Sequence, residues 1–128
     1  MAKKKFDFKS IQTVEDAFKK QNIDRSAIPA VSMIPERFRE ALLGVYELFI
    51  IFEAINDGWK ADFTNPNQIK YFPWQKVNSA GSGFGFASSV FGFDCTGTTV
   101  GSRLCTDTPQ KASYISKQFG PQYGKFFL

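Results

Sequence analysis

Histidine is absent from the 128 residues of this chain, and cysteine occurs only twice. Without histidine the chain lacks the usual general base near neutral pH, the commonest metal ligand and every Ser–His or Cys–His pair. Two cysteines also fall short of the four ligands that a structural zinc site needs. The sequence therefore predicts a protein that is not an enzyme and that uses no cofactor and no metal.

Acidic side chains are scarce in the second half of the chain. Residues 64–128 carry six basic side chains and only Asp94 and Asp107, whereas residues 1–63 carry ten of each sign, so the second half holds the whole net charge of +4. It also holds twelve of the twenty-one aromatic residues. A basic, aromatic surface is compatible with an anionic partner, although an ordinary sheet packed on helices has the same composition.

Long apolar runs are missing as well. The longest, residues 48–52, lies between Glu47 and Glu53 and is too short to cross a bilayer. The basic start, Lys3-Lys4-Lys5, is not followed by the apolar segment of a secretion signal, so we expect a soluble protein without a membrane partner. Residues 1–9 are expected to form a flexible, solvated tail.

The two cysteines are not expected to pair. If Thr96 and Gly97 form a tight turn, Cys105 lies several residues beyond the position that faces Cys95, which is too far for a disulfide. We therefore expect two reduced, partly buried thiols in a reducing compartment. A secreted, disulfide-bonded protein is the alternative.

Capping and stop signals predict helices over residues 13–21, 35–56 and 109–128. Thr13 and Asp16 have the spacing of a capping box at the start of the first helix. The last helix is expected to break at Gly120-Pro121 and then to resume.

The long second helix is apolar around most of its circumference. Glu36, Glu40 and Glu47 fall on one narrow stripe. The broad opposite face is formed by five apolar residues, which are Phe38, Leu42, Val45, Phe49 and Phe52. Because such a helix is buried on several sides, we predict that it is the central helix of the domain. The alternative is that it forms half of a dimer interface.

After residue 68 the pattern changes to strands. Residues 69–77, 84–93 and 98–105 are rich in residues that favour strands, with a turn at Thr96-Gly97 between the last two. Pro73 is expected to confine the first strand to a sheet edge or a bulge. The order of elements predicts one α+β domain over residues 1–128, in which N-terminal helices and a C-terminal helix flank a short antiparallel sheet of about three strands.

Five stretches together resemble an uncharacterised protein family of gut anaerobic bacteria and their phages. They are residues 53–59 (EAINDGW), 67–74 (NQIKYFPW), 81–86 (GSGFGF), 100–105 (VGSRLC) and 117–119 (KQF). The resemblance covers about residues 30–128. It implies a phage or prophage context, and hence a place in the cytoplasm of a bacterial host or in a virion, but no established activity.

The glycine-rich stretch GSGFGF does not match a phosphate-binding loop. The third glycine of a dinucleotide loop falls on Phe86, and the Gly-Lys-Ser/Thr of a P-loop is absent. Gly81 and Gly83 allow a turn or bulge, and Gly85 leaves one face of a strand bare. We favour close packing at this bare face, and a ligand site is the alternative.

Aromatic residues and lysines alternate around the first strand, namely Trp59, Lys60, Lys70, Tyr71, Phe72, Trp74 and Lys76. Alternation places Tyr71 on one face of the strand and Phe72 and Trp74 on the other. One face of the strand is expected to pack in the core. We favour a purely structural role, in the core and at the protected edge of the sheet, for the whole cluster. The alternative is that the other face stacks on the bases of single-stranded nucleic acid.

Arg103 lies in an apolar strand and needs a carboxylate if it faces the interior, for which Asp94 and Asp57 are the candidates. An anion clamp is the alternative. Residues 101–104 (GSRL) also resemble the strands that close C-type-lectin-like domains, including phage receptor-binding modules, which implies a ligand pocket beside Gly85 and Arg103. Cys105 has no histidine to activate it as a nucleophile.

These features predict a phage-related, non-catalytic binding or structural module. It is expected to contact a protein partner or a second copy of itself through the long helix or the aromatic sheet face. The alternatives are binding of single-stranded nucleic acid by the basic, aromatic second half and lectin-like ligand binding. The candidate ligand-binding residues are Trp59, Tyr71, Trp74, Gly83, Gly85 and Arg103.

Overall fold

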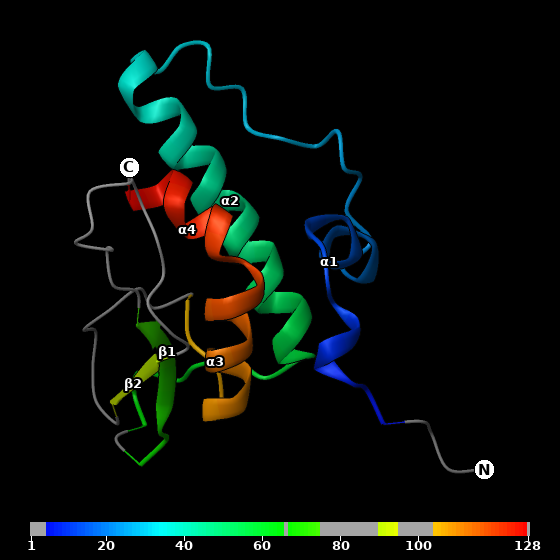
Figure 1. Ribbon diagram of the computed structural model, residues 1–128, viewed down its shortest axis with the longest axis vertical. Helices are drawn as coiled ribbons and strands as arrows, with labels where there is room; N and C mark the ends of the chain where they lie inside the picture. Colours follow the sequence, from blue (N-terminus) through cyan, green and yellow to red (C-terminus); the bar gives the residue numbers. More distant parts are fainter. Residues whose placement is uncertain (1–4, 66, 75–89, 95–103, 128) are drawn as a thin grey trace.

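The computed structural model describes residues 5–65, 67–74, 90–94 and 104–127. In chain order its elements are a 3-10 helix η1 (Phe8–Ser10), helices α1 (Val14–Lys20) and α2 (Glu36–Asn56), strands β1 (Lys70–Trp74) and β2 (Val90–Asp94), and helices α3 (Pro109–Gln118) and α4 (Gly120–Phe127) (Figure 1). The described part of the chain is therefore rich in helix and contains one small strand pair.

The predicted capping box begins α1. The Asp16 amide donates to the Thr13 hydroxyl oxygen at 3.1 Å, and the amides of Gln12 and Thr13 donate to the Asp16 carboxylate at 3.0 and 3.2 Å. Three backbone donors that the helix itself leaves without acceptors are thus satisfied by two side chains. The first helix is confirmed, with Thr13 as its N-cap and Gln21 as its C-cap.

The long helix is confirmed at both ends to within a residue. Pro35 occupies the N-cap position rather than the first turn, and the last helical residue is Asn56. The chain leaves the helix through Asp57 at φ 48° and Gly58 at φ 94°. Two successive left-handed residues end the helix sharply, and glycine adopts this conformation without steric cost.

The C-terminal helices also follow their sequence signals. The Thr108 hydroxyl accepts from the Lys111 amide at 3.2 Å, and Pro109 is the first residue of α3. The predicted break at Gly120 starts α4 directly after the C-cap Phe119. One face of α3 is buried through Ala112 and Ile115, and the C-cap residue Phe119 continues it.

Strands β1 and β2 pair antiparallel, with Lys70 opposite Asp94 and Trp74 opposite Val90. On the other edge of β1, Tyr71 exchanges both backbone hydrogen bonds with Thr106, at 2.9 and 2.7 Å. Backbone groups two residues apart point to the same edge of a strand. The missing N–H of Pro73 would therefore have pointed to the edge of β1 that faces Thr106. The hydrogen bonds between β1 and β2, on the opposite edge, are not affected by Pro73.

The predicted sheet of about three strands is shown only in part. The first predicted strand is confirmed as β1, although it is shorter than residues 69–77. Of the second predicted strand, residues 90–93 are described and are confirmed as part of β2. Of the third, only residues 104–105 are described, and the prediction is wrong for them, because they lie in no strand. Within the described part of the chain the sheet consists of β1, β2 and the single bridge to Thr106.

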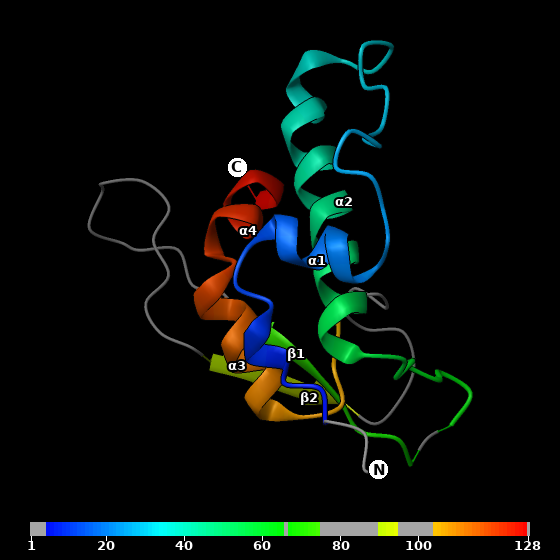
Figure 2. The same cartoon turned by 90° about the vertical axis from the view of Figure 1, so that its right-hand side faces the viewer.

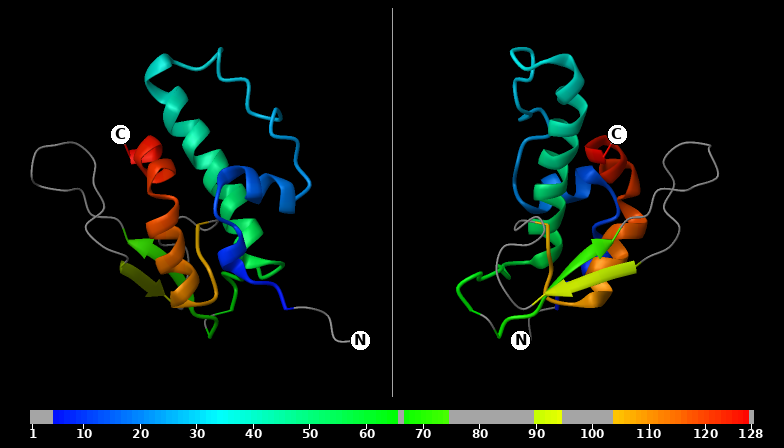
Figure 3. Two further views of the ribbon diagram at one scale, coloured as in Figure 1. Left: turned by 45° about the vertical axis from the view of Figure 1, so that its right-hand side comes forward. Right: turned by 90° about the vertical axis from the view of Figure 1, so that its left-hand side faces the viewer.

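One apolar core joins the helices. The C-terminal half of α2 lies at its centre, with α4 and α1 packed against it, while α3 packs on the strand pair (Figures 2 and 3). The fully buried side chains of the core include Phe18, Leu48, Ile51, Phe52, Ile55, Ile115 and Phe119. The predicted role of the long helix as the central helix therefore holds for this half.

Part of the expected N-terminal tail is attached to the core instead. Phe8 begins η1 and stacks edge-to-face on Tyr114, with ring centroids 5.5 Å apart. The Tyr114 hydroxyl donates to the carbonyls of Lys9 and Ile11 at 3.2 and 2.8 Å. The tail predicted over residues 1–9 is thus wrong for its second half, because aromatic side chains at Phe6 and Phe8 add apolar area to the core.

Candidate interaction surface

The N-terminal half of α2 extends beyond the other helices (Figures 1 and 3). Four apolar residues, the α2 stripe, run from the first turn of α2 to just beyond its midpoint, and they are Phe38, Leu42, Val45 and Phe49. Phe38 is 48% exposed and Leu42 and Phe49 are each 39% exposed, while Val45 is half-buried. Their spacing of four, three and four residues places them on one side of the helix. Large apolar side chains are thus left facing solvent in a row.

The prediction of which side of α2 is buried is wrong for this half. The broad apolar face was expected to be core, but only its last member, Phe52, is fully buried. On the glutamate side, Glu36 and Glu40 are exposed, whereas Glu47 is 6% exposed. The side of α2 that faces the core carries Leu48, Ile51 and Ile55, and Glu47 is buried beside it with cationic partners.

Glu47 accepts from two cations that are distant in the sequence. Arg25 Nη2 and Lys125 Nζ each donate to its carboxylate at 3.0 Å. The Arg25 guanidinium also lies over the Phe18 ring, 4.6 Å from its centroid. A buried carboxylate is tolerated when it is paired in this way. These two partners lie 22 and 78 positions from Glu47 in the sequence, so no local pattern reveals the interaction.

Charges of both signs border the stripe. Arg37 lies over the Phe38 ring at 4.6 Å from its centroid, and Glu36 and Glu40 are exposed on the same two turns. Because positive and negative side chains are mixed around the stripe, its surroundings do not favour a partner with a strong charge of one sign.

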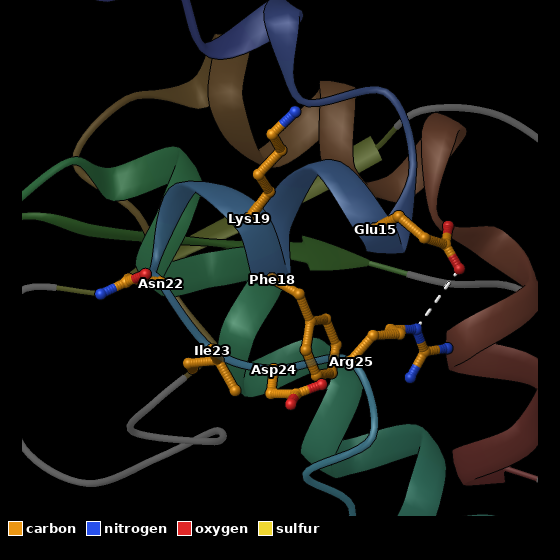
Figure 4. Close-up of a pocket in the computed structure, with 7 residues that line it drawn as sticks. All are labelled: Glu15, Phe18, Lys19, Asn22, Ile23, Asp24 and Arg25. Carbon is orange, nitrogen blue, oxygen red and sulfur yellow. Dashed lines mark hydrogen bonds and ion pairs between the residues drawn. The ribbon is translucent and has the colours of Figure 1, made fainter.

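A shallow hollow of about 460 Å³ lies beside α1 (Figure 4). In Figure 4 the Phe18 ring lies next to Arg25, whose Nε donates to Glu15 at 3.3 Å, while Lys19 points away. Hydrogen bonds from backbone amides hold the pKa values of the Glu15 and Asp24 carboxyls below their usual range, so both are charged at neutral pH. The hollow therefore offers neither an unengaged guanidinium nor a general acid.

The six ligand-binding residues predicted from the sequence are not assembled by the described part of the chain. Trp59 follows the C-terminus of α2 and is half-buried, and Tyr71 is half-buried in β1 next to Thr106. Trp74 ends β1, but its side chain lies outside the described part. The predictions for Gly83, Gly85 and Arg103 fall outside the described residues, and so does the turn at Thr96-Gly97.

Most described cations of the second half are engaged within the protein. Lys70 is 2% exposed, and its ammonium donates to the Asn65 carbonyl at 3.2 Å and lies 5.1 Å from the centroid of the Phe63 ring. Lys111 pairs with Asp107 at 2.9 Å, and Lys125 with Glu47. Lys117 is exposed. A basic surface for nucleic acid thus receives little support from the described residues.

Two further predictions about chemistry are answered near the end of α2. Asp57, a candidate partner of Arg103, pairs with Lys20 at 2.7 Å. Cys105 is buried, and burial raises the pKa of its thiol to about 11, which leaves it protonated at neutral pH. No sequence signal indicated that the Asn56 side-chain amide donates to the Cys105 carbonyl at 2.9 Å, or that the Asn56 Oδ1 is buried without a hydrogen-bond partner among the described residues.

No family model matches the chain, and no curated protein or solved structure shows significant similarity to it. Among the described residues, no group of three or more potential metal-binding side chains gathers at one place. None of the described helices has the length and apolarity to span a membrane. The α2 stripe is the feature of the described surface that most needs a functional explanation.

Proposed function

We propose that this chain is a non-catalytic interaction module that associates through the α2 stripe, in the first place with a second copy of itself. One observation carries the proposal. Three large apolar side chains, Phe38, Leu42 and Phe49, are exposed along one side of α2, and the N-terminal half of this helix extends from the body (Figure 1). Apolar side chains that gather on one side of a helix, instead of being scattered singly, indicate a surface on which a second helix can pack.

The geometry of the stripe supports self-association. Apolar residues that alternate by four and three positions are the pattern by which two helices interlock side chains. In an antiparallel pair centred between Leu43 and Gly44, Phe38 would face Phe49 of the other copy and Leu42 would face Val45. Every apolar side chain of one stripe would then meet an apolar side chain of the other.

The size of the stripe predicts a weak contact. A phenylalanine offers about 200 Å² of surface, so the three exposed side chains together offer about 250 Å² per copy. A standard interface buries about 800 Å² per partner. The stripe thus supplies a central apolar patch and leaves the rest to polar neighbours, which favours a dissociation constant of about micromolar or weaker.

Described side chains with titratable groups support a role without catalysis. The pKa of the Cys105 thiol is raised by burial, and the carboxyl pKa values of Asp16 and Asp62 are lowered by hydrogen bonds that they accept. A general acid or base works best when its pKa lies near the working pH. In each of these groups the pKa is shifted further away from pH 7.

The biological setting that we propose rests on the family resemblance of residues 30–128. It favours a phage or prophage protein that acts in a bacterial host or within a virion, where weak repeated contacts between copies are useful.

A dilution series monitored by amide chemical shifts tests the proposed contact. We expect concentration-dependent shifts that cluster at residues 37–50 and leave α3 unchanged. Chemical-shift changes that cluster around Trp59 and β1 instead would show that the interface lies in the strand region. A spectrum that does not change with concentration would contradict self-association.

A further inference from the structure

Residues 24–35, which join α1 to α2, form a strap without regular secondary structure. None of its side chains is buried, and Ile28 and Met33 are exposed. The strap runs beside the N-terminal half of α2 (Figures 1 and 2). A segment that contributes no buried side chain to the core is held chiefly by its hydrogen bonds and ion pairs.

Two side chains of α2 hold the strap through its backbone. The Tyr46 hydroxyl donates to the Ala27 carbonyl at 2.6 Å. The Arg39 guanidinium donates to the carbonyls of Ile34 and Ser32 at 2.8 and 3.0 Å. At the α1 end, Arg25 is fixed by its pairs with Glu15 and Glu47. The strap is therefore firmly anchored at its start and lightly attached along α2.

Both attachment residues border the α2 stripe. Arg39 lies three residues before Leu42, and Tyr46 lies four residues after Leu42 and three before Phe49. Residues at these spacings are neighbours on a helix surface. The Tyr46 ring also packs edge-to-face on Phe18, with centroids 6.1 Å apart, so it stays in place when its hydroxyl is released. A second molecule that covers the stripe would therefore lie beside the two residues that hold the strap.

We propose that the strap detaches from α2 with the opening of its own turns and that its release widens the apolar surface from the stripe to Tyr46. This inference rests on the proposed function of the stripe, whose regulation it describes. A second copy that binds the open form more tightly than the closed form shifts the population towards it. Residues at the strap's attachments would then set how readily the protein associates.

Tyr46→Phe tests the device in the isolated protein by amide hydrogen exchange. The reporters are the amides of Ala27, Ile28 and Ile34, which donate only to carbonyls within the strap. We expect their exchange to accelerate between about two- and tenfold, the change expected on losing one hydrogen bond of ordinary net strength. The buried half of α2, residues 52–55, is expected to keep its protection. Arg39→Gln is the second variant and removes the other attachment.

Tyr114→Phe is the matched control, because it removes a tyrosine hydroxyl bonded to the carbonyls of Lys9 and Ile11 far from the strap. A dye that becomes fluorescent on apolar surface, anilinonaphthalene sulfonate, reports the widening. We expect more fluorescence with Tyr46→Phe and Arg39→Gln than with the control.

Three outcomes would overturn the inference. They are unchanged exchange in both variants, acceleration of the strap only together with residues 52–55, and faster strap exchange without a rise in dye fluorescence. None of them touches the proposed function, which fails separately if substitutions in the stripe leave association unchanged.

Discussion

Glu47 lies where α2, α4 and the residues after α1 meet, and its carboxylate accepts from Arg25 and Lys125 at 3.0 Å. The Glu47 carboxylate can be buried from solvent because both cations are paired with it. The two cations are partly exposed, so each keeps contact with water if the carboxylate is lost. The two pairs therefore compensate the burial of Glu47 and add little to the total stability.

Glu47→Gln is expected to lower the free energy of unfolding by about 1–3 kcal/mol, less than the loss of a fully buried pair, because Arg25 and Lys125 can turn towards solvent. Urea denaturation measures the change. Glu40→Gln, on an exposed position of the same helix, is the control and should stay within about 0.5 kcal/mol of the parent protein. Equal effects of the two substitutions would show that the two pairs do not stabilise the buried Glu47.

The capping box predicts a dependence of stability on pH. Hydrogen bonds from the Gln12 and Thr13 amides hold the pKa of Asp16 below its ordinary value of 3.8. A carboxyl with a lowered pKa contributes stability that is fully present above pH 3.8 and is lost as the pH falls through its folded value. We expect Asp16→Asn to lower the urea midpoint at pH 7 and the difference from the parent to shrink below pH 3.8. A difference that stays constant down to pH 2 would contradict this role of the charge.

At the scale of elements, α2 consists of two halves with different surroundings. Its C-terminal half is buried on nearly all sides, whereas its N-terminal half carries the stripe and meets the strap through Arg39 and Tyr46. Phe49 and Phe52 lie one turn apart across this boundary. Phenylalanine is therefore part of the core at position 52 and partly exposed to solvent at position 49.

The two phenylalanines give a matched pair of substitutions. Phe52→Ala is expected to cost about 3–5 kcal/mol of stability, because it leaves a cavity in a fully buried site. Phe49→Ala should cost less, about 1–2 kcal/mol, since 39% of Phe49 already faces water. Denaturation at low protein concentration measures both without a contribution from association. Similar losses at the two positions would show that Phe49 belongs to the core.

The sequence predicted elements better than their orientation. Thr13 with Asp16, Asp57 with Gly58, and Thr108 with Pro109 are local signals, and each placed a helix end to within about a residue. The burial of Glu47 depends instead on Arg25 and Lys125, which no local pattern connects to it. Lys70 looked like part of a basic surface for the same reason, because its burial depends on Phe63 and Asn65 across a loop.

For the whole molecule, the helices share one core that ties the two ends of the chain together. The Tyr114 hydroxyl and the Gln118 amide of α3 donate to backbone carbonyls of residues 9–12, and Lys125 of α4 reaches Glu47. What this body presents outward is the half of α2 that it does not cover. The central claim is therefore that the uncovered stripe joins one molecule to another.

Sedimentation velocity over a concentration series from about 1 to several hundred micromolar tests that claim most directly, since the small stripe implies micromolar or weaker affinity. Three proteins are compared, the parent chain, Leu42→Lys in the stripe and Glu40→Lys on an exposed position of the glutamate side of the same helix. We predict that the parent and Glu40→Lys shift towards a dimer as concentration rises, while Leu42→Lys stays monomeric. A parent protein that remains monomeric throughout, or a Leu42→Lys variant that dimerises as well as the parent, would contradict the account.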